Sequence, residues 1–171
     1  MDKEPETAGR SLTMVRVAGA DRRRIWFDNG IELEMPCQGR IWSYLEFMDR
    51  VMVLMNIFDI EHCDQCRNIF CWRKEDGGLL WQVARAVRPD GRECEGAYKY
   101  LELKVRMEDG SYCYAGESVR HGERLWGGVY LKPFRVGEDR LLAMTLEEYP
   151  CEVEVDYETG AVRFLALHQK V

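Results

Sequence analysis

The residues best suited to chemistry are His62, Cys63 and Cys66, which stand together in the segment Glu61-His62-Cys63-Asp64-Gln65-Cys66. A Cys-x-x-Cys pair beside a histidine offers part of the ligand set of a structural zinc ion, which needs four ligands. No second close cysteine pair follows, so the sequence favours a polar loop with incidental thiols and predicts no cofactor. A redox function is weaker, because no helix N-terminus that would lower a thiol pKa is evident.

No other constellation in the chain predicts catalysis, and we expect a protein that is not an enzyme. The histidines His62, His121 and His168 lie far apart in the sequence, and nothing marks one of them as the base of a nucleophilic pair. The glycine pairs at 77–78 and 127–128 lack the lysine and hydroxyl of a phosphate-binding loop, so they are predicted to be turns.

The cysteines are odd in number and irregularly spaced, which is typical of buried free thiols in a reducing compartment rather than of a bridged secreted scaffold. There are seven of them: Cys37, Cys63, Cys66, Cys71, Cys94, Cys113 and Cys151.

Carboxylates are dense near the C-terminus, and the alternation around Val153 and Val155 places two of them on one side of a strand. They form either a solubilising face or one half of an electrostatically complementary interface with a basic protein. The candidate partner-binding residues are Glu147, Glu148, Glu152, Glu154 and Asp156.

Length and charge restrict the class of protein. At 171 residues, with 46% apolar and 32% charged residues, the chain suits one folded domain, predicted over 13–171 after a flexible N-terminus at 1–12. The net charge of −6 makes nucleic acid an unlikely partner, although Arg22, Arg23 and Arg24 form a basic run near Trp26. No secretory signal or apolar membrane span is present, which predicts a cytoplasmic protein without a membrane partner.

Four segments share one pattern: a run of strand-forming residues, a turn containing glycine, and a second run. Period-two alternation predicts strands, and Asn-Gly or Asp-Gly supplies the positive φ of tight turns. The predicted hairpins join 24–27 to 31–35, 68–72 to 79–83, 101–107 to 111–114, and 151–155 to 161–165.

The remaining segments complete the pattern. Two runs at 41–47 and 51–55 are predicted to be strands, with a helix as the alternative, and further runs lie at 129–136 and 141–147. Long loops are expected at 84–96 and 118–128. The fold class is therefore all-β: a predominantly antiparallel meander of hairpins in open, partial propeller-like or sandwich sheets, with little helix.

The second and fourth hairpins resemble strand pairs of pyrroloquinoline-quinone-type propeller blades. The residues that carry this likeness are Asp76-Gly77-Gly78-Leu79-Leu80-Trp81-Gln82 and Val155-Asp156-Tyr157-Glu158-Thr159-Gly160-Ala161-Val162. The chain also resembles a group of small bacterial β proteins with such hairpins. The resemblance implies a propeller-like architecture and says nothing about catalysis.

The acidic charge, the long loops and the β scaffold predict a non-catalytic protein-binding module, whose most concrete form is an immunity protein that covers the active site of a basic bacterial toxin. The alternatives are a structural or accessory subunit of a bacterial or phage assembly, and a zinc or thiol protein that uses Cys63 and Cys66.

Overall fold

The computed structural model describes residues 15–36, 39–56, 64–115, 127–130 and 133–169. These residues form twelve strands and one short 3-10 helix, η1 (Gln65–Arg67). The strands are β1 (Val17–Ala20), β2 (Ile25–Phe27), β3 (Ile41–Phe47), β4 (Arg50–Met55), β5 (Ile69–Arg73), β6 (Leu79–Gln82), β7 (Tyr98–Arg106), β8 (Tyr112–Ala115), β9 (Gly127–Tyr130), β10 (Arg140–Thr145), β11 (Cys151–Val155) and β12 (Val162–Leu167). The predicted all-β class is confirmed.

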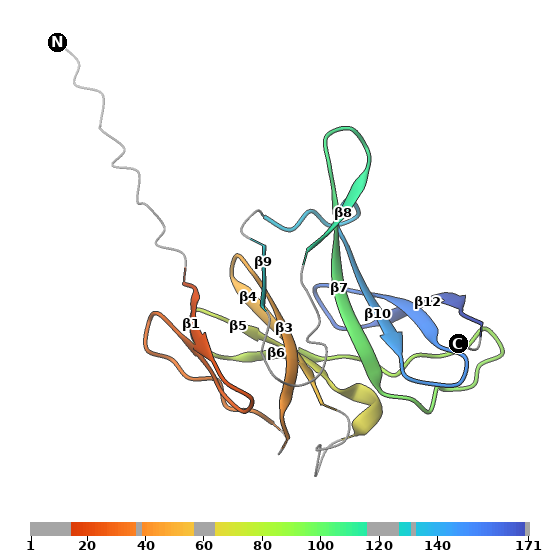
Figure 1. Ribbon diagram of the computed structural model, residues 1–171, viewed down its shortest axis with the longest axis horizontal. Coiled ribbons are helices and arrows are strands. Elements are labelled where there is room, and N and C mark those ends of the chain that lie inside the picture. The colour runs from red at the N-terminus through yellow and green to blue at the C-terminus, as the bar shows by residue number, and fades with distance from the viewer. Residues whose placement is uncertain (1–14, 37–38, 57–63, 116–126, 131–132, 170–171) are drawn as a thin grey trace.

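The strands are arranged in three layers (Figure 1). The β1–β2 hairpin covers one face of a five-stranded sheet with the order β6-β5-β4-β3-β9, and the other face packs against a second five-stranded sheet with the order β12-β11-β10-β7-β8. Neighbouring strands are antiparallel, except that β9 runs parallel to β3. Both larger sheets contribute to one hydrophobic core.

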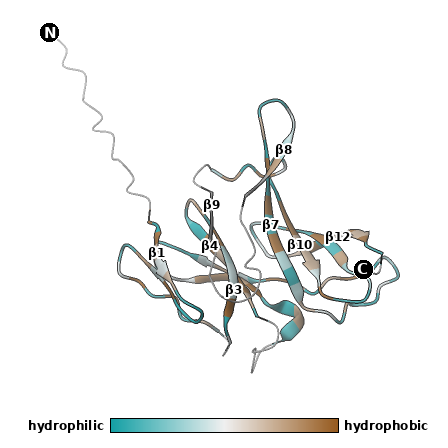
Figure 2. Ribbon diagram, viewed as in Figure 1, coloured by the Kyte–Doolittle hydropathy of each residue, from teal (hydrophilic) through white to brown (hydrophobic). Residues whose placement is uncertain are grey.

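The middle sheet explains the uninterrupted apolar runs in the sequence. Along β4, Val51 and Val53 face the β1–β2 hairpin, whereas Met52 and Leu54 face the second sheet, and all four are buried. A strand that is covered on both faces has no reason to alternate between apolar and polar residues. In Figure 2 the strands carry long brown, apolar stretches, whereas η1 is drawn in mixed colours.

The second sheet has one buried face and one outer face, so its strands do alternate. On β11, Val153 and Val155 point into the core, and Glu152 and Glu154 lie together on the outer face, as predicted. About 2 kcal/mol of stabilisation for each fully buried aliphatic side chain gives this sheet a fixed register.

Three of the four predicted hairpins are confirmed, since β5 pairs with β6, β7 with β8 and β11 with β12, all antiparallel. Gly30, Gly110 and Gly160 have φ values of +86°, +84° and +74°, which glycine adopts without steric cost. The first hairpin differs from the prediction, because β2 pairs mainly with β1 and meets the 31–35 segment through a single bridge at Glu32. The segment before β2 therefore supplies a strand that the sequence pattern did not reveal.

The prediction that the second glycine pair is a turn was wrong. Gly127 and Gly128 begin β9 and pair with Tyr44 and Leu45 of β3. The alternation rule could not show this, because glycine carries no side chain and the parallel partner lies far away in sequence. The strand predicted at 129–136 is correspondingly shifted, since β9 ends at Tyr130 and no strand is formed by residues 133–136. The flexible terminus at 1–12 and most of the loop at 118–128 lie outside the described residues.

The turn between β11 and β12 joins the two larger sheets. The indole Nε1 of Trp81 on β6 donates to the Tyr157 carbonyl at 2.9 Å, and the Arg50 guanidinium lies 4.2 Å from the centre of the Tyr157 ring. Phe134 stacks on the same ring at 4.2 Å. These contacts attach the second sheet to the middle sheet.

Candidate functional site

The 84–96 connection between β6 and β7 is held in place by two buried polar residues. The side chain of Asn68 accepts the Tyr98 N–H at 2.9 Å and donates to the carbonyls of Met55 and Tyr98. The hydroxyl of Tyr98 in turn donates to the Ala84 carbonyl at 2.7 Å. Because buried polar groups are costly to leave unpaired, this network fixes both ends of the connection.

The connection is itself a small hairpin rather than an irregular loop. Gly91, with a φ of +86°, closes the Pro89-Asp90-Gly91 turn, and the Arg88 N–H donates to the Arg92 carbonyl. The Cys94 N–H donates to the Ala86 carbonyl at 2.7 Å, and both of these side chains are buried. The connection thus presents its charged side chains from an ordered backbone.

Glu147, in the connection between β10 and β11, ties the second wall of the site to the first. Its Oε1 accepts the Gly96 N–H at 2.6 Å, and its Oε2 accepts from Arg88 at 3.1 Å. A side chain at position 96 would overlap the Glu147 side chain and the Leu146 backbone, so glycine is required there. Glu147 was predicted to bind a partner, but its carboxylate is already engaged within the protein.

The 84–96 connection and the connection between β10 and β11 line an open pocket of about 510 Å³, which we call the loop-end pocket. Besides Gly96, it is lined by the two apolar residues Leu146 and Tyr149 and by six charged residues: Arg88, Arg92, Glu93, Glu95, Glu147 and Glu148. Leu146 and Tyr149 are exposed. Among these lining side chains the four carboxylates outnumber the two guanidinium groups, and Glu93 and Glu147 form ion pairs with Arg85 and Arg88.

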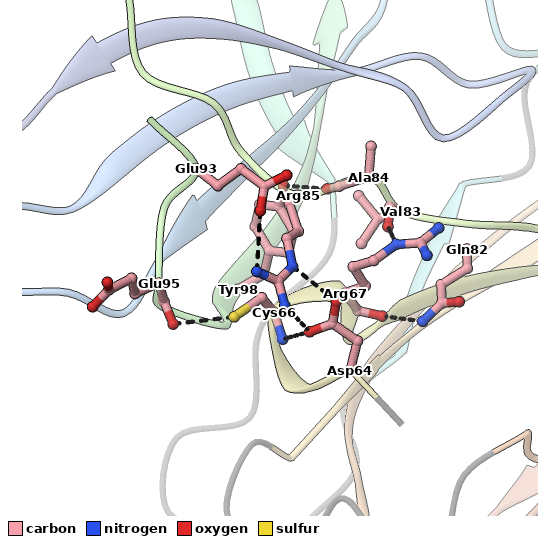
Figure 3. Close-up of polar contacts among 10 residues, drawn as sticks. All are labelled: Asp64, Cys66, Arg67, Gln82, Val83, Ala84, Arg85, Glu93, Glu95 and Tyr98. Carbon is pink, nitrogen blue, oxygen red and sulfur yellow. Dashed lines mark hydrogen bonds and ion pairs between the residues drawn. The ribbon is translucent and has the colours of Figure 1, made fainter. Parts of the chain in front are cut away.

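A second polar network shares Glu93 and Glu95 with the lining of the pocket (Figure 3). Arg85 lies between two carboxylates: its Nε and Nη2 donate to Asp64 at 2.8 and 3.0 Å, and its Nη1 donates to Glu93 at 3.2 Å. Asp64 also caps η1 by accepting the Cys66 N–H. The hydrogen bonds from Arg85, opposed by partial burial, lower the pKa of Asp64, so this carboxylate is ionised at neutral pH.

Cys66 is part of this network, and its thiol is partly buried. Its Sγ donates to the Glu95 carbonyl at 3.1 Å, and burial raises its pKa, with Arg85 acting in the opposite direction. A thiol with a raised pKa is protonated at neutral pH and is therefore a weaker nucleophile than a thiolate. His62 and Cys63, the other two members of the predicted metal set, lie outside the described residues.

Three of the predicted acidic residues do not line the pocket: Glu152, Glu154 and Asp156. Glu154 accepts from Arg140 at 2.7 Å and from Arg163 at 2.6 Å, and these bonds outweigh burial and lower its pKa. Glu152 lies 2.6 Å from His168. The predicted acidic cluster is therefore divided between two surfaces.

Asp156 belongs to neither surface, because it caps the turn between β11 and β12. Its Oδ1 accepts the N–H groups of Glu158 and Thr159. Of the five predicted residues, only Glu147 and Glu148 line the loop-end pocket.

Sequence reasoning missed Arg88 and Tyr149 as members of the site. For Arg88 the one available signal was the predicted loop at 84–96, since long ordered loops often carry function, whereas Tyr149 lies outside that loop. The residues that the structure describes contain no group of three or more metal-ligating side chains arranged to hold an ion. No helix among them is both long and apolar enough to cross a membrane.

Comparison with protein-family models, with curated proteins and with solved structures found no match for this chain. The likeness to propeller hairpins therefore stays a prediction. The function has to be argued from the loop-end pocket itself.

Proposed function

We propose that this chain is a non-catalytic protein-binding module, that the loop-end pocket is its binding surface, and that its partner is basic. The observation that carries this proposal is the combination in one pocket of excess carboxylates with exposed Leu146 and Tyr149. Protein interfaces combine a tyrosine or other apolar anchor with a charged rim, and opposite charges raise the association rate.

The hydrogen bonds that hold the pocket walls in place support the proposal. Arg88, Glu147 and Gly96 link the walls directly, and Arg85 links Glu93 to η1. A surface that is ordered before binding loses little conformational entropy in the complex. Glu95 and Tyr149 remain exposed above this framework and are the residues best placed to contact a partner.

The most concrete form of this function is that of an immunity protein. A basic toxin would present a lysine or arginine to the pocket, Tyr149 would cover the neighbouring apolar surface, and the bound module would block the toxin's active site. Such a protein would act in the cytoplasm of a bacterial cell.

The test is complex formation with the protein encoded by the neighbouring gene, measured by size-exclusion chromatography. We expect a stoichiometric complex with the wild-type chain, and its loss with Glu95→Lys combined with Tyr149→Ala. The matched control is Glu108→Lys, which makes the same charge change at an exposed turn between β7 and β8. Absence of a wild-type complex, or an equal effect of the control, would overturn the proposal.

A further inference from the structure

A second surface lies on the β1–β2 hairpin, which is on the opposite side of the molecule from the 84–96 connection in Figure 1. Trp26 lies at the centre of β2, between Ile25 and Phe27, which are buried against the middle sheet. Since successive side chains of a strand point to opposite faces, Trp26 points away from the core. It is 36% exposed.

The indole of Trp26 is held flat on the hairpin. Gly19 is its partner on β1, and a side chain at that position would overlap the six-membered ring of the indole. The missing side chain at Gly19 creates the space in which the ring lies. Packing against Gly19 restricts the indole, and a side chain that is restricted before binding loses less entropy in an interface.

The turn that precedes Trp26 is equally well fixed. The carboxylate of Asp21 accepts the N–H groups of Arg23 and Arg24, both at 2.8 Å. The Arg22 carbonyl accepts the N–H of Ile41 at the start of β3. The backbone that carries these arginines is therefore tied both to itself and to the middle sheet.

The charges on this turn are only partly neutralised. Arg24 pairs with Asp21 at 3.1 Å and lies 5.8 Å from the centre of the Trp26 ring. Arg22 and Arg23 are exposed. In contrast to Arg24, neither of them forms an ion pair with any of the residues that the structure describes. The guanidinium groups of Arg22 and Arg23 are thus left available on the turn that leads into the strand of the exposed Trp26.

We propose that Arg22, Arg23 and Trp26 form a second contact surface, which binds an acidic segment of a protein. Arginine binds carboxylates through two parallel hydrogen bonds, and tryptophan and arginine are enriched among residues that dominate binding energy. This surface is separate from the loop-end pocket, so the inference does not depend on the proposed function.

Charge also distinguishes a protein segment from a nucleic acid. Glu32 and Glu34 are exposed on the segment that follows β2, and the chain as a whole carries a charge of −6. A long polyanion such as a nucleic acid would be repelled by these glutamates and by the overall negative charge. A short acidic segment can contact Arg22 and Arg23 without extending over the rest of the surface.

The test is fluorescence anisotropy with a labelled eight-residue peptide of alternating glutamate and leucine, at low salt. We expect binding that weakens about tenfold or more with Arg22→Glu combined with Arg23→Glu, since each lost charge-assisted contact removes roughly 1 kcal/mol or more. The matched control, Lys99→Glu combined with Arg106→Glu, makes the same charge change at exposed positions of β7 and should alter binding less than about twofold.

A further variant separates binding from a merely structural role of the indole, which covers Gly19. Trp26→Leu should weaken peptide binding while circular dichroism shows an intact fold. The inference is overturned if the wild-type chain does not bind the peptide, if the arginine variant behaves like its control, or if Trp26→Leu binds as well as wild type. It is also overturned if a fifteen-nucleotide oligothymidine binds more tightly than the peptide.

Discussion

Replacement of Lys74 by methionine should destabilise the protein severely, because it breaks a buried ion pair. The Nζ of Lys74 lies 2.7 Å from Oε1 of Glu46, and the two side chains are only 1% and 4% exposed. The same carboxylate oxygen accepts the Val17 N–H at 2.7 Å, and the ammonium also donates to the Val15 carbonyl at 3.1 Å. This pair attaches the β1 strand to the middle sheet.

The size of the effect follows from what the substitution leaves behind. Lys74→Met keeps an apolar side chain of similar length but leaves the Glu46 carboxylate buried without its cation, which costs about 3–5 kcal/mol. Glu46→Gln in the same chain removes the stranded charge, and its amide oxygen can still accept the Val17 N–H. The double variant should therefore be more stable than Lys74→Met alone.

The assay is urea unfolding followed by tryptophan fluorescence, with the four chains of a double-mutant cycle. Arg73→Met is the matched control, because Arg73 is the neighbouring residue and forms an exposed pair with Asp76 at 3.1 Å. We expect the control to lose less than about 1 kcal/mol. The reasoning is refuted if Lys74→Met loses no more than Arg73→Met, or if the two effects at Glu46 and Lys74 simply add.

Two further predictions concern the turns and the support of the pocket. Gly160→Ala should lower the free energy of unfolding more than Gly110→Ala. Both glycines have positive φ, but an added Cβ at Gly160 would lie 2.5 Å from the Trp81 ring, whereas Gly110 has no neighbour within 4 Å. In thermal unfolding we expect a loss of about 1–2 kcal/mol for Gly110→Ala and at least about 1 kcal/mol more for Gly160→Ala, and equal losses would contradict this. Asp64→Asn should cost about 1 kcal/mol at pH 7, since the folded pKa of Asp64 is lowered chiefly by Arg85. The stabilisation by that carboxylate is present above its ordinary pKa of 3.8 and is lost as the pH falls through the lower folded pKa, so the difference between variant and wild type should shrink at acid pH, and a difference independent of pH would argue against it.

The strands and turns could be predicted from the sequence because each depends on a few neighbouring residues. Asp109-Gly110 and Thr159-Gly160 mark turns whose geometry only glycine adopts easily, and the strands beside them alternate with period two. The apolar run 51–55 predicted a strand, but not that both of its faces are covered, since this depends on two distant layers.

The candidate site could be predicted only in part, because its residues come from segments that are far apart in the sequence. Glu147 and Glu148 were selected by charge density, yet their neighbours Arg88 and Glu95 come from a connection about fifty residues earlier in the chain. Charge density alone also could not separate them from Glu154, whose carboxylate is neutralised by arginines on adjacent strands. Such pairings depend on strand order, which periodicity does not specify.

The central claim, that the loop-end pocket is the binding surface, is tested most directly by hydrogen–deuterium exchange. The exchange of the chain alone would be compared with that of its complex with the protein encoded by the neighbouring gene. We predict that protection on binding is concentrated in residues 88–96 and 146–149. Unchanged exchange in both segments, with protection elsewhere on the chain, would contradict the account.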